Sequence, residues 1–148
     1  LRMQEVNIFI QTGIKSIRPA DGAAGYLLEA QTEKGPATLS RIYTIKDATV
    51  HAAELSVLIE AVKRIKEPCS LTVFTDSTYI AAAVENGWLE GWAANDWKTS
   101  RGKNVANREL WEELRKLLRT HTATFTREPG EYSSWLKCEV ERKERLYV

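Results

Sequence analysis

The segment from Leu71 to Thr75 does most to limit the possible folds of this chain. It reads Leu-Thr-Val-Phe-Thr, so apolar side chains fall on both faces of the predicted strand. A strand with two apolar faces is typical of the interior of a parallel sheet that helices cover on both sides. Asp76 follows at once and precedes a helical segment. Because α/β sheets bind ligands at the carboxyl ends of such strands, Asp76 is a candidate functional residue.

The remaining segments complete a mixed sheet. Residues 6–10, 26–30 and 38–45 are short β-patterned runs separated by turn residues, which indicates an antiparallel meander. A helical pattern with Thr49 as its expected N-cap then joins the meander to the parallel strand. Further helices are predicted at 77–85, 88–94, 105–119 and 133–145, and a last strand at 122–126. We expect an α/β fold of order βββαβααβα, with a five-stranded mixed sheet whose central strand is 71–75 and helices on its faces.

Length and composition are those of one globular domain, which we place at residues 4–146. The 148 residues are 43% hydrophobic and 28% charged, and no apolar run approaches the ~20 residues that span a bilayer, so no membrane is expected. Cys69 and Cys138 have neither disulfide-framework nor metal-site spacing, which favours a reducing, cytoplasmic location. The two residues before Met3 are left out of the fold. The start near Met3 argues against excision from a polyprotein.

A local excess of basic residues suggests a surface for phosphate groups. The net charge is only +1, but residues 98–119 hold seven Lys or Arg against three Glu. A local basic surface can bind nucleic acid even when the whole chain is nearly neutral. The alternative is a solvated helix with i,i+4 pairs such as Glu112–Lys116.

Two carboxylates suit a hard-cation site. Asp76 ends the apolar strand, and Glu54 lies beside the apolar stripe of the preceding helix, in line with Leu58 and Ala61. Mg²⁺ takes a few carboxylates together with phosphate and water. Two such ions ~3.5–4 Å apart can stabilise both oxygens of a phosphoryl displacement. Alternatively, Asp76-Ser77 only caps the next helix, and Glu54 is a glutamate that the helix dipole favours near a helix start.

Five stretches of this sequence resemble the ribonuclease H family, which cuts the RNA strand of RNA–DNA hybrids with acid-bound magnesium. They are Gly22 to Tyr26, Thr49 to Leu55 with Glu54, Phe74-Thr75-Asp76-Ser77, Trp88 to Thr99 with Trp92 and Trp97, and Asn107 to Trp111. The resemblance runs from Val6 to about Arg142. It implies a ribonuclease H-like fold, Mg²⁺ or Mn²⁺ as cofactor, and two-metal hydrolysis of an RNA–DNA hybrid.

The resemblance also implies roles for particular residues. The catalytic set would be Gln11, Glu54, Asp76 and Glu139, converging on one sheet edge, with Glu54, Asp76 and Glu139 as metal ligands. The nucleic-acid-binding set would be Trp88, Trp92, Lys98, Arg101, Lys103 and Asn107. Tryptophans bury large areas wherever they lie, so core packing is the alternative role for those of this region.

Three departures from the family pattern concern both catalysis and binding. Gln11 stands where the family has an aspartate, and its neutral amide replaces a bridging carboxylate. Residues 127–131 read Arg-Glu-Pro-Gly-Glu where the family has a mobile histidine loop; Glu128 or Glu131 could approach the site, while His51 and His121 lie elsewhere in the sequence. Residues 93–96 lack the cations that the family carries between its second and third tryptophans.

These departures leave two functions open. The first is a metal-dependent endoribonuclease for RNA–DNA hybrids that is weakened by Gln11. The second is a non-catalytic ribonuclease H-like module that binds nucleic acid or protein. The retained acids favour the first function, and Gln11 with the missing histidine favours the second.

Overall fold

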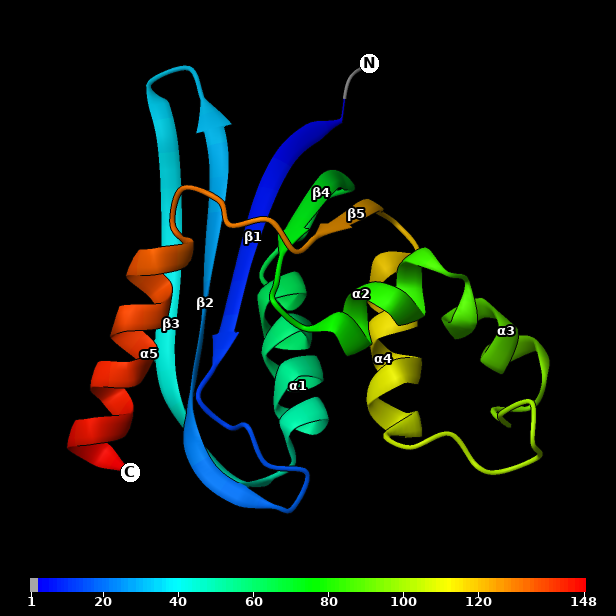
Figure 1. Ribbon diagram of the computed structural model, residues 1–148. Helices are drawn as coiled ribbons and strands as arrows, with labels where there is room; N and C mark the ends of the chain where they lie inside the picture. Colours follow the sequence, from blue (N-terminus) through cyan, green and yellow to red (C-terminus); the bar gives the residue numbers. More distant parts are fainter. Residues whose placement is uncertain (1–2) are drawn as a thin grey trace.

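The computed structural model describes residues 3–148, which form one sheet with helices on both faces (Figure 1). The strands are β1 (Gln4–Thr12), β2 (Ala20–Thr32), β3 (Gly35–Ala48), β4 (Cys69–Phe74) and β5 (Thr122–Thr126). The helices are α1 (Val50–Lys63), α2 (Thr78–Glu85), α3 (Trp88–Ala94), α4 (Arg108–Leu118) and α5 (Ser133–Tyr147). β1 pairs antiparallel with β2 and parallel with β4, and β4 pairs parallel with β5. The predicted five-stranded mixed sheet is confirmed.

The position of β4 in the sheet differs from the prediction. The strand order is β3-β2-β1-β4-β5, so the middle strand is β1, and β4 lies between β1 and β5. The two apolar faces of β4 correctly indicated an interior parallel strand, but they do not tell how many strands lie on each side of it. Residues 22–25, predicted to precede the second strand, belong to β2 itself, which begins at Ala20.

Three helices lie between β4 and β5, one for each range predicted there, so the observed order is βββαβαααβα and the predicted order omitted one helix. Gly87, with a φ of 75°, separates α2 from α3. α4 begins at Arg108 instead of Val105 because Asn107 has a left-handed φ of 60°. None of the helices in residues 3–148 has the length and apolar composition needed to cross a membrane.

The predicted helix starts are confirmed by their caps. The Thr49 side chain accepts a hydrogen bond from the Ala52 backbone N–H at 3.3 Å, and the Ser77 side chain accepts one from the Ile80 N–H at 3.2 Å. Ser77, and not Asp76, is therefore the cap of α2. The carboxylate of Asp76 remains exposed beyond the end of β4.

The helices divide the molecule into layers around the sheet. α5 packs on β1, β2 and β3, while α1 packs on β1 and β2 and is itself covered by α4. Ile8 belongs to the core on the α1 side, whereas Phe9 belongs to a smaller cluster with Leu136 of α5. Because side chains alternate along a strand, Gln11 projects to the same face as Phe9, toward α5.

Glu144 fastens the C-terminal part of α5 to the sheet. Its Oε1 accepts a hydrogen bond from the backbone N–H of Ala23 at 2.8 Å. A Cβ at Gly13 or at Gly22 would collide with the Glu144 carboxylate. The carboxylate fits between these two positions because both residues are glycines. The glutamate therefore joins α5 to the segments that flank the end of β1.

We predict that Glu144→Ala lowers the free energy of unfolding by about 1–3 kcal/mol, because the buried Ala23 N–H loses its acceptor. Glu141→Ala, an exposed position on the same helix, is the matched control. Urea denaturation of both variants and the wild type measures the difference. Equal stability of the two variants would show that this hydrogen bond does not secure α5.

Candidate active site and nucleic-acid interface

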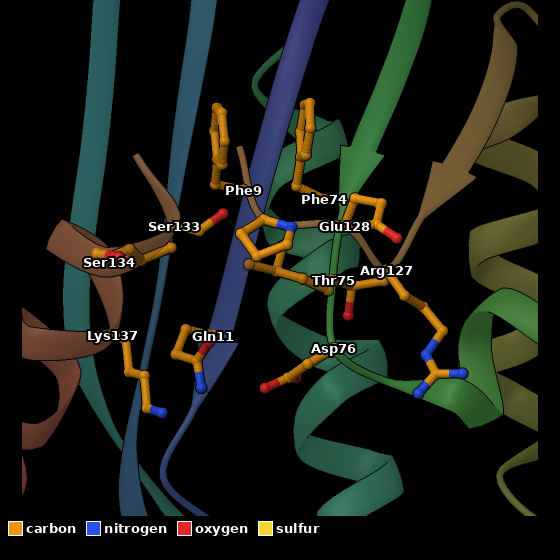
Figure 2. A pocket seen from close by; sticks show the side chains of 13 residues that line it. Phe9, Gln11, Phe74, Thr75, Asp76, Arg127, Glu128, Ser133, Ser134 and Lys137 are labelled. Carbon is orange, nitrogen blue, oxygen red and sulfur yellow. The ribbon is translucent and has the colours of Figure 1, made fainter. Parts of the chain in front are cut away.

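A cleft of about 260 Å³ opens at the carboxyl ends of β1 and β4 (Figure 2). Gln11 lines it from β1, and Thr75 and Asp76 line it where the chain leaves β4. The opposite wall comes from residues 127–129 and from the start of α5. This is the sheet edge at which the sequence predicts a site.

Glu54 reaches the same edge from α1. A narrow recess beside the cleft, too tight to hold a water, is bordered by Gln11, Glu54 and Asp76, together with Thr12 and Thr75. Glu54 is only 8% exposed, whereas Asp76 is exposed to solvent. The structure thus brings three of the four expected catalytic positions together, with one carboxylate buried and one open.

His51 is a site residue that the sequence interpretation missed. Its Nδ1 lies 3.1 Å from Oε1 of Glu54. Its ring stacks on Tyr79, with centroids 3.8 Å apart, and the Tyr79 hydroxyl accepts a hydrogen bond from Trp111 Nε1 at 2.8 Å. These contacts fix the buried carboxylate from the side of α2 and α4. The i,i+3 spacing of His51 and Glu54 on one helix was the available signal.

Asp76 is positioned by the residues on either side of it. The Thr75 Oγ1 accepts a hydrogen bond from the Ser77 N–H at 3.0 Å, and the Thr75 N–H donates to the Thr126 carbonyl at 3.1 Å. Thr75 and Ser77 are both buried. The backbone around Asp76 is therefore held while its side chain points into the cleft (Figure 2).

Glu139 does not join this cluster. Leu136 and Val140 of α5 face the sheet, and each residue advances ~100° around a helix of 3.6 residues per turn. This phase places Lys137 in the cleft and Glu139 on the side toward β3, where Glu139 pairs with Arg142 at 3.7 Å. Among residues 3–148, no three His, Cys, Asp or Glu side chains lie close enough to share an ion. The expected ligand set of three acids is not assembled.

The donors at this edge suit one divalent ion better than two. Glu54 and Asp76 supply two negative charges, and Gln11 adds a neutral amide oxygen. A single Mg²⁺ binds through one or two carboxylates and completes its shell with water and phosphate oxygens. Two ions would bring four positive charges against these two carboxylates, so the residues present do not fit a two-ion site.

The loop after β5 lies against two stacked aromatic rings. Phe9 and Phe74 have ring centroids 4.6 Å apart and an interplanar angle of 7°. Gly130 lies so close to them that a Cβ there would come within 2.7 Å of each ring. The edge of Tyr132 meets Phe9 at 5.5 Å, and burial, together with nearby carboxylates, raises the pKa of Tyr132. This packing holds the loop against the sheet, at the position where the sequence departs from the histidine loop of the family pattern.

A second cavity, of about 490 Å³, lies between α3 and the loop that follows it. Trp88, Trp92 and Lys98 line it. Trp88 is 48% exposed, whereas Trp97 and Trp111 are buried. The core-packing role is therefore confirmed for Trp97 and Trp111, and Trp88 offers an aromatic surface.

The cations of residues 98–119 divide into paired and unpaired groups. On α4, Arg108 pairs with Glu112 and Arg115 pairs with Glu90, so the expected Glu112–Lys116 pair is replaced by one with Arg108. Lys98 donates a hydrogen bond to Asn104 within the loop. Within residues 3–148, Arg101 and Lys103 are exposed and form no ion pair. Asn107 starts α4 and does not line the cavity beside Trp88.

This fold, with Glu54 and Asp76 at the carboxyl edge and a tryptophan-bearing helical extension, defines a ribonuclease H-like protein. The profile of the RNase H family matches residues 4–130. Ribonuclease H from Chlorobium phaeobacteroides is 37% identical over 134 residues, which cover 86% of this chain and 85% of that protein. The chain belongs to the ribonuclease H family.

Solved structures share the fold at low sequence identity. LC9-RNase H1, described as a type 1 RNase H with the type 2 active-site motif, has a TM-score of 0.77 at 17% identity and covers 100% of this chain and 75% of its own. LC11-RNase H1 in complex with RNA/DNA hybrid has a TM-score of 0.57 at 18% identity, with 93% and 97% covered. The chain spans about half the length of several other bacterial ribonucleases H that it matches, between 49% and 57%.

We predict that Glu54→Gln and Asp76→Asn each weaken Mn²⁺ binding about tenfold or more, because each removes one of two carboxylates from a site that depends on them. Glu139→Gln should leave Mn²⁺ affinity unchanged, since this side chain lies on the β3 side of α5. Isothermal titration of the three variants with Mn²⁺ alone provides the comparison. An equal loss in Glu139→Gln would contradict the placement of Glu139.

Proposed function

We propose that this chain binds RNA–DNA hybrids and hydrolyses the RNA strand in a divalent-cation-dependent reaction, at a rate that Gln11 keeps low. The observation that carries the proposal is the presence of Glu54 and Asp76 at one cleft edge, on the fold of the ribonuclease H family. Hydrolysis of a phosphodiester is the chemistry that carboxylates and a hard cation support together.

Each residue of the edge has a distinct role in this proposal. Glu54 and Asp76 would hold one Mg²⁺ or Mn²⁺, with the Gln11 amide oxygen beside them. Such an ion would stabilise charge on the phosphate during in-line displacement. His51 keeps the Glu54 carboxylate in place, and Thr75 fixes the backbone that carries Asp76.

The surface around α3 is the proposed contact for the nucleic-acid backbone. The exposed ring of Trp88 can stack on a base or sugar, with Trp92 behind it. Lys98, Arg101 and Lys103 lie on the loop that borders this cavity and would neutralise phosphates. Asn107 is a further proposed contact. The complex of LC11-RNase H1 with RNA/DNA hybrid supports this class of partner.

A non-catalytic module is the second candidate. Gln11 replaces one acid, Glu139 faces away from the cleft, and Lys137 lies where another acid was expected. Such a module would keep the surface around Trp88 and lose hydrolysis. A module that binds nucleic acid would thus differ from the nuclease only in cleavage, whereas a module that binds protein would differ in hybrid binding as well.

We predict that Gln11→Asp raises hybrid cleavage about tenfold, which corresponds to about 1.4 kcal/mol of added stabilisation. The added carboxylate lies at the edge that Glu54 and Asp76 already share, so it strengthens ion binding there. Cleavage of a labelled hybrid across a Mg²⁺ and Mn²⁺ titration is the measurement. Asp76→Asn is the control for contaminating nuclease.

The outcomes separate the two candidates. Wild-type cleavage that Asp76→Asn abolishes and Gln11→Asp increases supports the nuclease. Intact hybrid binding without cleavage by either the wild type or Gln11→Asp supports the non-catalytic module. If Gln11→Asp binds two ions and cuts no better, the missing carboxylate is not the limiting defect. The loop without histidine would then explain the low rate better.

A further inference from the structure

The side of the cleft next to Gln11 carries hydrogen-bond donors and a positive charge. Figure 2 shows the Lys137 and Asp76 side chains on either side of Gln11, with Lys137 reaching in from α5. Ser133 and Ser134 line the same wall from the first turn of α5. Glutamine can donate through its amide N–H₂, which an aspartate at that position cannot do.

Lys137 has no counter-ion within the described part of the chain. No carboxylate of residues 3–148 lies within ion-pair distance of its ammonium group. Glu139, two residues further along α5, is directed toward β3 and pairs with Arg142. The Lys137 charge is therefore available to a ligand in the cleft.

The Lys137 ammonium and the Gln11 amide, which lie side by side in Figure 2, together suit an anion with several oxygens. Charge-assisted hydrogen bonds from lysine to phosphate are stronger than neutral ones. The cleft of about 260 Å³ is far larger than the ~10–15 Å³ that one water requires, which leaves ample room for one phosphate group. Arg127 lies on the far side of Asp76 and is not part of this wall (Figure 2).

We propose that Lys137 and Gln11 form a phosphate subsite that binds the nucleic-acid backbone directly, in the place where a second divalent ion does not fit. The proposal rests on the proposed function, because it requires a hybrid to reach the cleft. Its consequence is that part of the hybrid affinity does not depend on divalent cations. Lys137 supplies a fixed single charge to a backbone phosphate, while Glu54 and Asp76 remain available for one ion.

The test is hybrid binding in EDTA, measured by fluorescence anisotropy at several salt concentrations. Lys137→Ala should weaken binding about three- to tenfold, and the magnitude of the log–log salt slope should fall by about 0.9, the value for one phosphate contact. Lys137→Arg should retain the affinity because it keeps the charge. Lys34→Ala, on the β2–β3 turn at the opposite end of the sheet, is the matched control and should bind as the wild type does.

Reversing the charge at Lys137 tests whether this residue contacts phosphate in the cleft or only adds to a basic surface. Lys137→Glu should lower hybrid affinity in EDTA more than Lys137→Ala does. It should also raise Mn²⁺ affinity in the absence of nucleic acid, because it places a third carboxylate beside Gln11 and Asp76. Circular dichroism melts confirm that the variants fold; the exposed position of Lys137 makes this the expected result.

The outcomes distinguish this proposal from the proposed function. If an Arg101→Ala/Lys103→Ala double variant weakens binding and every Lys137 variant behaves like Lys34→Ala, the hybrid binds as proposed and the phosphate subsite is overturned. Absence of any hybrid binding by the wild type overturns both proposals. Loss of affinity in Lys137→Ala with retention in Lys137→Arg supports the subsite.

Discussion

The parallel pairing of β1 with β4 is the constraint on which the site depends. This pairing aligns the carboxyl ends of the two strands, so that Gln11 and Asp76 emerge at one edge. Glu54 reaches that edge because α1 packs on β1. The hydrogen bond that Thr75 accepts and the capping of α2 by Ser77 then fix the backbone of residues 75–77, which carries Asp76. Without this register, neither a cation nor a phosphate would meet a convergent set of side chains.

Charge balance decides what this edge can bind. Two carboxylates next to an amide suit one divalent ion, and Lys137 brings a positive charge to the opposite wall. A fixed ammonium offers less charge than a divalent ion, but it requires no ligands from the protein. Under the proposed function, the Lys137 contact with phosphate would therefore not depend on the rate of hydrolysis. The nuclease and the non-catalytic nucleic-acid-binding module would both use this cleft, with Asp76 on one wall and Lys137 on the other.

Most of the fold could be predicted from local patterns. Each of the signals used is contained within a few consecutive residues. They are the apolar faces of β4, the caps Thr49 and Ser77, and the β-pattern at 122–126. The middle position of β1 could not be predicted in this way, because strand order depends on contacts between distant segments. The left-handed φ of Asn107, which delays the start of α4, was also not visible in the helical pattern.

The candidate site shows the same limit at the level of single side chains. Glu54 and Asp76 were recognised from strand and helix positions, and the structure brings them together. The placement of Glu139 was wrong because the rotation of α5 is set by how Leu136 and Val140 pack on the sheet. The role of His51 depends on its stacking against Tyr79 from another helix. These contacts arise only after the helices have packed.

The most direct test of the central claim is the number of divalent ions at this edge in the presence of nucleic acid. Crystals of the protein with a short RNA–DNA hybrid, soaked in Mn²⁺, would locate the ions by anomalous scattering. We predict one ion between Glu54 and Asp76, with a backbone phosphate in contact with Lys137. Two ions ~3.5–4 Å apart at Gln11, the spacing of two-metal sites, would contradict this account.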